Sequence, residues 1–509
     1  MLCLGIYTLS HAQTIDIDID WSHHLRAIPE YAYGVNSPAH FIPAYSNDME
    51  FMEKVELITQ KKGMIRLHGW GMLGDSPEAW QIDGVWDAVK IQNALTPLME
   101  QGYQVMINIP SGPAGEDDYQ NPAAFAQFCA DLVQIVNVDY HLGVKYWEIP
   151  NERESGFVTP GLSTLQMSNL IKTAALAMKA VDSTIQIGGA ATAWVNIEYL
   201  TELVELTPEM DFISCHTYSG DCTNSLDDMY NVAQYAAEDL WMLRKALNAN
   251  DPLQYIPIFL TEYNLSFQGC DYIQSHEGAV YDAIMMTEPL KAGIDATCYW
   301  NIAPYSDMSV IIGDELKENA HLFENFNKFF QGALVESYSS DSTKVLVYST
   351  VDESTNNYAF CLINRTAVNQ NVQVQTVGIV PDTLQRFLWS EQSSYLGDTT
   401  TWQDLANGNM SLPPLSVTMF RGNSSFVSVS NVSEMEKVAS YPNPNTGLLH
   451  LLPENNGNSY QIISTVGTVL KSGVIKNNRI RMKAIPQGVY YIKIIDKKGS
   501  FQMITVMKE

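Results

Sequence analysis

Residues 145–152, KYWEIPNE, form a short apolar run that ends in a carboxylate, Glu152. Residues 258–264, IFLTEYN, have the same form and carry Glu262 near their end. Aromatic and β-branched residues bounded by turn residues predict β-strands. Six more such runs occur between residues 30 and 330, so the eight predicted strands are Ala32–Asn36, Met64–Leu67, Gln104–Ile109, Lys145–Ile149, Ile185–Gly189, Phe212–His216, Ile258–Glu262 and Ala296–Trp300.

Helical periodicity occupies most of the segments between these runs. The predicted helices are Phe51–Thr59, Trp86–Met99, Pro122–Asn137, Leu165–Val181, Met229–Leu247, Gly278–Ala292 and Leu322–Phe330. Eight β–α alternations over about 300 residues predict an α/β fold, a (β/α)8 TIM barrel, at residues 30–330. A doubly wound open sheet is the alternative. It would carry a Gly-rich phosphate turn after the first strand, where this chain has Gly34-Val-Asn-Ser-Pro.

The whole chain is acidic, and its charge is unevenly distributed between two parts. It has 509 residues, 46% of them hydrophobic, and a formal net charge of −28. The apolar fraction excludes wholesale disorder. The acidity argues against a nucleic-acid partner and against docking on anionic membranes, because both need Lys and Arg. Residues 434–509 have a net charge of +5 and the preceding residues −33, which predicts a separate C-terminal module.

Two β domains are expected after the barrel. Residues 331–421 are predicted to form an adjacent β-sandwich, and residues 14–29, which begin with strict alternation, are expected to complete its sheet. We expect this sandwich to pack against the barrel without binding sugar. Residues 422–436 are Ser/Asn-rich and predict a linker. Residues 437–509 predict a small all-β domain of short strands.

The start of the chain indicates export. Residues 1–12 are an apolar run followed by Ser10-His11-Ala12, which resembles the latter part of a secretory signal peptide. No Lys or Arg precedes the run, which is consistent with a truncated start. No later segment approaches the ~20 apolar residues that span a bilayer. We therefore expect an exported product without a membrane span.

The cysteines do not predict a metal site. Their spacing lacks C-x-x-C pairs with partner histidines, so a structural zinc site is not expected. Cys222 and Cys270 lie in Gly/Asp/Ser-rich loops and are candidates for a disulfide, with two free thiols as the alternative. The others, apart from Cys3 in the signal, lie in apolar patterns and are expected in the core.

The residues at the C-terminal ends of the predicted strands indicate a catalytic site. Barrel active sites lie at the C-terminal ends of the strands, where Glu152 and Glu262 stand. A carboxylate directly after an apolar run is costly to bury unpaired. Two convergent carboxylates suit glycoside hydrolysis, in which one protonates the leaving oxygen and the other attacks the sugar carbon. Ordinary structural ion pairs are the alternative for each.

These residues also carry a family resemblance. Trp147-Glu-Ile-Pro-Asn-Glu152 is similar to the Trp-x-x-x-Asn-Glu signature of clan A of the retaining glycoside hydrolases, although Pro150 departs from many members. Glu262 matches the carboxylate that the clan carries after its seventh strand. The resemblance covers roughly residues 14–421. It implies that Glu152 is the general acid/base and Glu262 the nucleophile, with Glu152 protonated at rest.

Within the clan, three segments most resemble family 39, the β-xylosidase and α-L-iduronidase family. They are Glu262-Tyr-Asn264, residues 211–218 (DFISCHTY) and Tyr299-Trp300. Families 51, 30 and 79 are close competitors. The resemblance to family 39 implies a β-xylosidase-like activity. The competitors imply arabinofuranosidase, endoglycanase or glucuronidase activity.

Other residues near the strand ends are expected to bind substrate. Arg66 is expected to keep the nucleophile ionised, as clan A enzymes commonly do with such an Arg, and Asn151 to bond the sugar 2-hydroxyl. His216 and Tyr218 are expected to orient Glu262 or bond substrate, with a satisfied rim histidine as the alternative for His216. Trp300 is placed to stack on a sugar face.

Four further residues near the rim are weaker candidates. Asn36 and His68 are possible sugar contacts, and Trp70 and Trp194 are loop aromatics that either stack on sugar or pack. Glu148, four residues before Glu152, is expected to support the barrel interior. The mechanism needs no metal or organic cofactor.

The C-terminal module has its own resemblance. Tyr441-Pro-Asn-Pro, the strand Gly488-Val-Tyr-Tyr-Ile and the basic end resemble the C-terminal sorting domain of type IX secretion. That resemblance implies a bacterium of the Bacteroidota and export to the cell surface or medium. The expected partners are therefore a polysaccharide or oligosaccharide substrate and the type IX secretion machinery, with no nucleic acid. A non-catalytic carbohydrate-binding protein on an inactive barrel remains the alternative.

Overall fold

The computed structural model describes residues 14–38, 48–69, 79–112, 119–250, 255–379, 381–392, 395–423, 440–441, 448–451, 457–464, 469–483, 485–495 and 501–508. The candidate signal peptide, Trp70 and most of the expected linker lie outside these residues.

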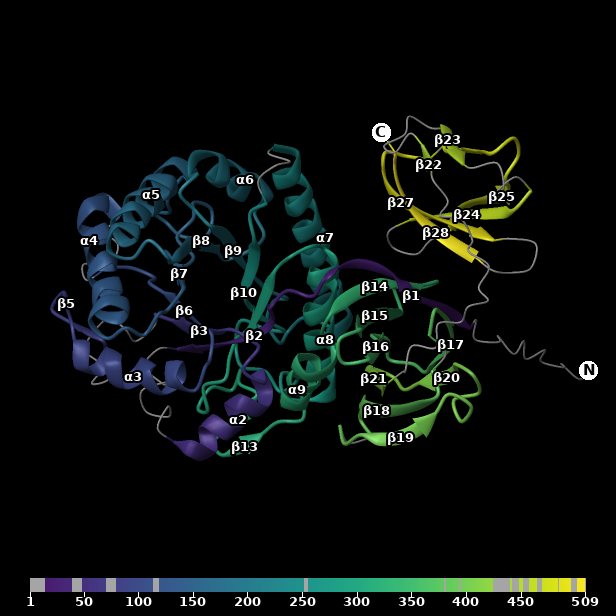
Figure 1. The fold of residues 1–509 in the computed structure, drawn as a ribbon, viewed down its shortest axis with the longest axis horizontal. Helices are drawn as coiled ribbons and strands as arrows, with labels where there is room; N and C mark the ends of the chain where they lie inside the picture. The colour runs from purple at the N-terminus through teal and green to yellow at the C-terminus, as the bar shows by residue number, and fades with distance from the viewer. Residues whose placement is uncertain are drawn as a thin grey trace, which may run out of the picture.

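A closed parallel barrel forms the larger part of the molecule (Figure 1). Its strands are β2 (Tyr31–Pro38), β3 (Ile65–His68), β6 (Val105–Asn108), β7 (Tyr146–Glu148), β8 (Gln186–Thr192), β9 (Phe212–Tyr218), β10 (Ile258–Asn264) and β11 (Ala296–Tyr299). Each overlaps one of the eight predicted runs, and β11 pairs with β2 to close the ring. The predicted TIM barrel is therefore confirmed, and the doubly wound sheet is excluded.

A helix follows each barrel strand. The helices are α2 (Met49–Thr59), α3 (Ala88–Glu100), α4 (Pro122–Val133), which continues into a π-helical turn η2 (Gln134–Asp139), α5 (Thr164–Val181), α6 (Ile197–Leu206), α7 (Leu226–Asn250), α8 (His276–Lys291) and α9 (Ala320–Phe329). Local capping explains several starts. Asp87 caps α3, and Ser163 with Gln166 forms a capping box at α5. The helix α6 was not predicted. It is short and is started by Asn196, whose side chain accepts from the Tyr199 N–H.

The two ends of the barrel differ in chemistry. An apolar cluster of Tyr31, Met64, Met106, Phe212, Phe259 and Ala296 fills the interior near the strand starts. Polar and charged side chains fill the interior near the strand ends, among them Arg66, Glu148 and Glu262, each 5% exposed or less. A buried charge needs a partner, so this end is where ion pairs must form.

A nine-stranded, mostly antiparallel sheet packs beside the barrel. Its order is β19-β18-β21-β16-β15-β14-β1-β17-β20. The strands are β1 (Ile15–Ala27), β14 (Ala333–Ser339), β15 (Val345–Asp352), β16 (Asn357–Asn364), β17 (Gln370–Val377), β18 (Thr383–Trp389), β19 (Asp398–Thr401), β20 (Asn409–Leu412) and β21 (Ser416–Asn423). The N-terminal strand β1 lies inside this sheet. It pairs antiparallel with β14 and parallel with β17, and its alternating Ile15, Ile17 and Ile19 enter the core.

Two short hairpins lie in the loops of the barrel. One pairs β4 (Gln81–Ile82) with β5 (Val85–Trp86), and the other pairs β12 (Ile311–Ile312) with β13 (Glu315–Leu316).

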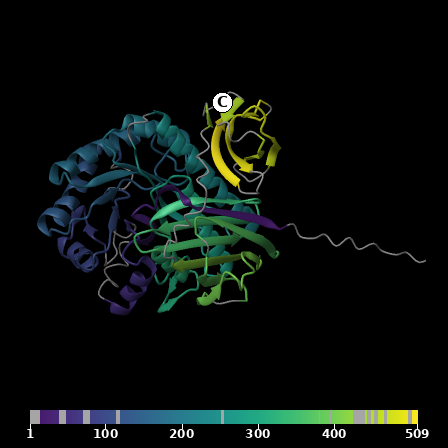
Figure 2. The same cartoon turned by 45° about the vertical axis from the view of Figure 1, so that its right-hand side comes forward.

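The C-terminal module is all-β. A sheet of β25 (Val469–Val474), β24 (Ser459–Ser464), β27 (Gly488–Ile495) and β28 (Phe501–Lys508) faces a smaller one of β22 (Ser440–Tyr441), β23 (Leu448–Leu451) and β26 (Arg479–Arg481). The module has its own apolar core, which includes Leu449, Ile480 and Ile492. It sits beside β1 and β14 in both views (Figures 1 and 2).

One ion pair joins the module to the body. Lys493 Nζ on β27 lies 2.7 Å from Asp18 Oδ2 on β1, and Asp18 is 3% exposed. Burial raises the pKa of Asp18, and Lys493 opposes that rise.

Among the described residues, no helix is both long and apolar enough to cross a membrane.

Candidate active site

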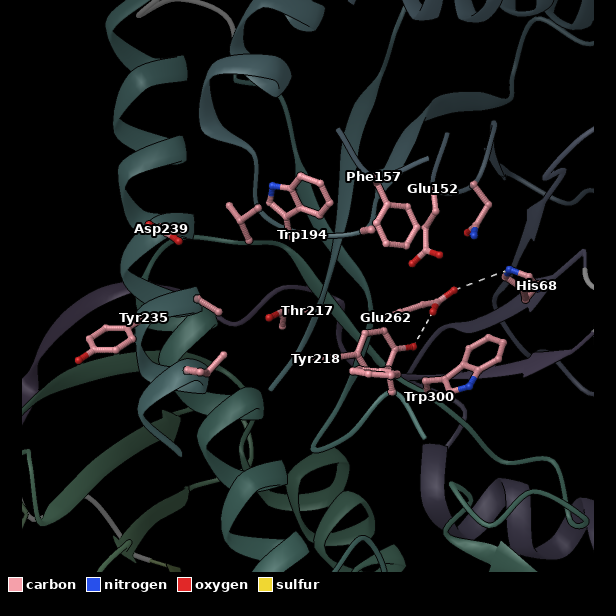
Figure 3. A pocket seen from close by; sticks show the side chains of 16 residues that line it. His68, Glu152, Phe157, Trp194, Thr217, Tyr218, Tyr235, Asp239, Glu262 and Trp300 are labelled. Carbon is pink, nitrogen blue, oxygen red and sulfur yellow. Dashed lines mark hydrogen bonds and ion pairs between the residues drawn. The ribbon is translucent and has the colours of Figure 1, made fainter. Parts of the chain in front are cut away.

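Glu262 lies near the end of β10 and is almost fully buried. Its Oε1 accepts a hydrogen bond of 2.7 Å from Arg66 Nη1. Its Oε2 accepts one of 2.6 Å from the Tyr218 hydroxyl (Figure 3). The Nε2 atoms of His68 and His216 each lie 3.8 Å from Glu262 Oε1. Burial alone would raise the pKa of Glu262. The charges of His216 and Arg66 and the Tyr218 hydrogen bond outweigh burial, so the pKa of Glu262 is lowered to about 2.

Arg66 is the centre of the charged network beneath the cavity. It is fully buried on β3, and its guanidinium contacts four side chains. It donates to Glu148 Oε2 at 2.6 Å, Asn36 Oδ1 at 2.9 Å, Glu262 Oε1 at 2.7 Å and Asn151 Oδ1 at 2.8 Å. Burial favours a neutral Arg66, but the carboxylates of Glu148 and Glu262 raise the pKa of its guanidinium above its ordinary value.

Glu148 supports the barrel interior, as predicted. Its side chain is fully buried, and its Oε2 also accepts from Asn108 Nδ2 at 2.9 Å. It therefore balances the Arg66 charge on the side away from Glu262. The guanidinium plane is held by acceptors on several sides, which fixes the direction of the bond to Glu262.

Glu152 stands in a different environment from Glu262. Its side chain is 27% exposed against 6% for Glu262. The Glu152 backbone has φ 51°, in the left-handed region, which costs a non-glycine residue on the order of 1–3 kcal/mol. Its N–H donates to the Ala191 carbonyl at 2.9 Å, and this bond holds the turn after β7 against β8. The chain therefore turns sharply at Glu152 and aims its carboxyl group over the barrel mouth.

His216 lies between the two carboxylates. Its Nδ1 is 2.8 Å from Glu152 Oε1, and its ring is fully buried at the end of β9. Burial would lower the pKa of His216, but Glu262 and the Glu152 bond raise it above the ordinary value. The Glu152–His216 hydrogen bond thus holds a proton between a carboxyl group and an imidazole at the mouth of the barrel.

The two carboxyl groups approach each other closely. One oxygen of Glu152, one oxygen of Glu262 and a ring nitrogen of His216 all lie within 4.8 Å of one another. Of the described residues, these three form the group that comes close enough to share a cation. The positive Arg66 already bonds Glu262, however, and Tyr218 occupies its other oxygen. The donor set therefore suits an ionised carboxylate held by protein groups rather than a metal ion.

A cavity of about 740 Å³ opens above these groups. His68, Asn151, Glu152, Tyr218, Glu262 and Trp300 line its inner end. The ring centroids of His68 and Trp300 lie 5.1 Å apart at 81°, which makes an edge-to-face corner. Burial lowers the pKa of His68 to about 3, so its ring is neutral.

The remaining predicted residues lie beneath the cavity rather than in its lining. Asn36 is fully buried, and its Nδ2 donates to the Thr261 carbonyl at 2.7 Å while its Oδ1 accepts from Arg66. Arg66 and His216 are also fully buried. These three side chains contact the groups that face the cavity. Asn36 was expected to contact a sugar, but its side chain has no exposed surface with which to do so.

Several lining residues were not predicted. They are Phe157, Ala193, Val195, Thr217, Val232, Tyr235, Ala236, Asp239 and Phe267. Val232, Tyr235, Ala236 and Asp239 have helical spacing on α7, but that pattern is typical of a helix face packed on a core. The signal that could have identified these α7 residues is that one helix face carries both an aromatic residue, Tyr235, and an acid, Asp239. Trp194, an open candidate in the sequence, lies in the lining.

A disulfide ties two loops at the outer wall. Cys222, after β9, is bonded to Cys270, after β10, with Cα atoms 5.8 Å apart. Cys129, Cys215, Cys298 and Cys361 are outside any disulfide and are buried, as expected for core residues. The Phe267 N–H also donates to the Gly220 carbonyl at 3.1 Å, so these loops are joined twice beside the cavity.

Residues 111–335 match the family model described as Glycosyl hydrolases family 39. The matched segment, which is less than half of the chain, is therefore similar to family 39 glycosyl hydrolases. This confirms the resemblance drawn from the strand-end motifs. Residues 439–508 match the model described as Secretion system C-terminal sorting domain. The expected sorting domain is thus confirmed, and it indicates export to the cell surface or beyond.

A curated protein is also similar to part of this chain. A β-xylosidase of Geobacillus stearothermophilus is 23% identical over 307 residues, which are 51% of this chain and 59% of the relative. The chain thus matches less than two thirds of that relative's length.

Solved structures show the same fold. A monomeric β-xylosidase from Caulobacter crescentus has a TM-score of 0.57 at 16% identity, covering 81% of this chain and 99% of its own. A family 51 α-L-arabinofuranosidase from Bifidobacterium longum has a TM-score of 0.62 at 13% identity, covering 81% and 100%. These identities show a shared fold, a barrel with an attached β domain.

Proposed function

We propose that this chain is an exported retaining glycoside hydrolase that cleaves O-glycosidic bonds by double displacement. The observation that carries the proposal is the pair of carboxyl groups with oxygens within 4.8 Å of each other in opposite environments. Retaining enzymes hold their carboxyl groups about 5–5.5 Å apart, and inverting enzymes about 6.5–9.5 Å. An oxygen of one carboxyl group within 4.8 Å of an oxygen of the other is compatible with the shorter of these separations, and this supports retention.

In the first step, Glu262 attacks the anomeric carbon and Glu152 protonates the leaving oxygen. Glu262 suits attack because its pKa of about 2 keeps it ionised. Glu152 suits proton transfer because it is more exposed and shares a hydrogen bond with His216. The bond between the sugar and the leaving oxygen breaks as the bond to Glu262 forms, and the proton leaves Glu152 with the released alcohol.

In the second step, the ionised Glu152 removes a proton from water, and the water oxygen replaces Glu262 at the anomeric carbon. Glu262 is now the leaving group. Arg66 and Tyr218 stabilise the carboxylate as it is released, because both bond its oxygens at 2.6–2.7 Å. Asn151, held by Arg66, is placed to bond the sugar 2-hydroxyl.

We further propose a xylosidase-like preference for a neutral sugar. The support is the similarity to family 39 and the β-xylosidase relative. The family 51 arabinofuranosidase shares the fold, so an arabinofuranoside is the competing substrate. Partners would be a glycan substrate and the secretion machinery that reads the C-terminal module.

The test is hydrolysis of aryl glycosides followed by NMR of the first product anomer. We expect turnover of one glycoside in a panel of xyloside, arabinofuranoside, glucoside, galactoside, iduronide and glucuronide, with the product of retained configuration.

Azide separates the two carboxylates. In Glu152→Ala, azide should attack the glycosyl-enzyme and give a glycosyl azide of retained configuration. In Glu262→Gly it should attack the substrate directly and give the inverted azide. A wild-type protein that binds glycans but turns over none of the panel would point to a non-catalytic binding protein instead.

A further inference from the structure

The cavity does not end at the two carboxylates. It extends from them to the outer helix α7, and its volume of about 740 Å³ is several times that of a single sugar ring. Figure 3 shows His68 and Trp300 on one side of the carboxylate pair. Phe157 lies on the other side, next to Glu152, and Trp194 lies beyond Phe157 toward α7. If Glu152 protonates the leaving oxygen, the leaving group must extend toward Phe157 and Trp194.

Two aromatic side chains form a ledge on that side. The ring centroids of Phe157 and Trp194 are 5.7 Å apart at 72°, an edge-to-face pair. Phe157 is 48% exposed and Trp194 38% exposed, although large apolar side chains usually avoid water. Exposed rings next to a catalytic carboxyl group offer flat apolar faces, which match the C–H face of a sugar ring.

The ledge is held rigidly to the acid/base loop. Glu154, two residues after Glu152 and fully buried, accepts from the Ala193 N–H through Oε1 at 2.7 Å. The Thr192 hydroxyl donates to the Trp194 carbonyl at 2.8 Å. The loop that carries Trp194 is therefore fixed before a ligand arrives, which reduces the entropy lost on binding.

The opposite wall, on α7, combines the apolar Val232 and Ala236 with two polar side chains. Helix α7 presents Tyr235, which is 60% exposed, and Asp239 to the same cavity. Burial raises the pKa of Asp239 above its ordinary value, but a carboxyl group in either state bonds hydroxyls well. An acid here disfavours anionic sugars and favours neutral ones.

We propose that Phe157 and Trp194, facing Tyr235 and Asp239, form a binding site for a neutral sugar unit on the leaving-group side of Glu152. This proposal rests on the proposed function and makes the preferred substrate a disaccharide or longer chain. The site selects the leaving group, while the pocket at His68 and Trp300 selects the sugar that is transferred.

The test compares two substrates that share one transferred sugar. A glycosyl fluoride of that sugar releases fluoride, which is too small to reach the ledge. An oligosaccharide of the same sugar places a ring on the ledge. For Trp194→Ala and for Phe157→Ala we expect kcat/KM on the oligosaccharide to fall about tenfold, the size of a lost aromatic contact. On the fluoride we expect kcat/KM to stay within about twofold of wild type.

Trp241→Ala is the matched control. Trp241 is 36% exposed on the same helix α7, but it lines a separate cavity near β27. The Trp241→Ala substitution should leave kcat/KM unchanged on both substrates. Tyr235→Ala gives a second reading from the opposite wall and should act as Trp194→Ala does.

The outcomes separate the two proposals. Equal losses on fluoride and oligosaccharide, or no loss on either, would overturn the leaving-group site while the enzyme remains a glycosidase. A wild-type protein that hydrolyses neither substrate for any sugar in the panel would overturn the proposed function, and the leaving-group site with it.

Discussion

Replacing Tyr218 by Phe should slow the second chemical step more than the first. The substitution removes the 2.6 Å bond from the Tyr218 hydroxyl to Glu262 Oε2 and leaves the Arg66 bond in place. In the first step Glu262 loses charge, so a lost donor costs little or even makes the carboxylate a better nucleophile. In the second step Glu262 regains its charge as it leaves, so the lost donor raises the barrier.

The size of the effect follows from the bond. A hydrogen bond to a charged group contributes about 1.5–3 kcal/mol. The carboxylate is only partly formed in the second transition state, so about half of that contribution should appear in the barrier. At 1.36 kcal/mol per factor of ten, kcat should fall about tenfold. The same loss should raise the pKa of Glu262 from about 2 by about 1–2.

The assay is stopped-flow release of dinitrophenolate from an activated glycoside. Tyr218→Phe should show a burst close to one equivalent per enzyme, with kcat lowered more than kcat/KM, and the acidic limb of kcat/KM should move upward. Tyr230→Phe is the control, because it removes a hydroxyl bond of 3.0 Å to the Glu277 carbonyl away from the cavity. Equal losses in kcat and kcat/KM without a burst would refute the assigned role of Tyr218.

Three further perturbations have expected outcomes. His216→Asn should move the alkaline limb of the pH–rate profile downward, because the raised pKa of His216 keeps a proton in its hydrogen bond to the Glu152 side chain at higher pH. An unmoved limb would contradict this role of His216. Lys493→Met should leave the buried Asp18 charge without its ion-pair partner, so limited proteolysis should release the C-terminal module faster, whereas Lys493→Arg should not. Replacing Cys222 and Cys270 together by Ser should lower the free energy of unfolding by up to about 4 kcal/mol, the loop-closure value for a separation of 48 residues, in denaturant titrations; an unchanged midpoint would show that the disulfide adds no stability.

Much of the fold could be predicted because barrel strands are short apolar runs whose neighbours along the chain are also neighbours in space. KYWEIPNE and IFLTEYN stand out because each carries a carboxylate where an apolar run stops. Helix α6 was missed because it is only ten residues long and has three buried side chains, although Glu198, Glu202 and Glu205 have helical spacing. Its start depends on the Asn196 cap, which is a weak signal in a sequence.

The two carboxylates of the site could be predicted from the sequence, but the contacts of the buried side chains beneath them could not. That Arg66 touches Glu148 and Glu262 together depends on barrel closure, which brings β3, β7 and β10 around one interior. Asn36 was expected at the substrate, but its polar atoms bond Arg66 and the Thr261 carbonyl inside the barrel. The α7 wall was missed because Tyr235 and Asp239 have the spacing of any amphipathic helix.

The central claim is that Glu262 forms a covalent bond with the sugar while Glu152 moves the proton. The most direct measurement uses an activated 2-deoxy-2-fluoro glycoside of the preferred sugar, whose fluorine slows both steps and lets the intermediate accumulate. Intact-mass analysis followed by peptide mapping of the full chain should show one added fluoro-sugar, carried by the peptide with Glu262. An adduct on Glu152, or inactivation without any adduct, would contradict the account.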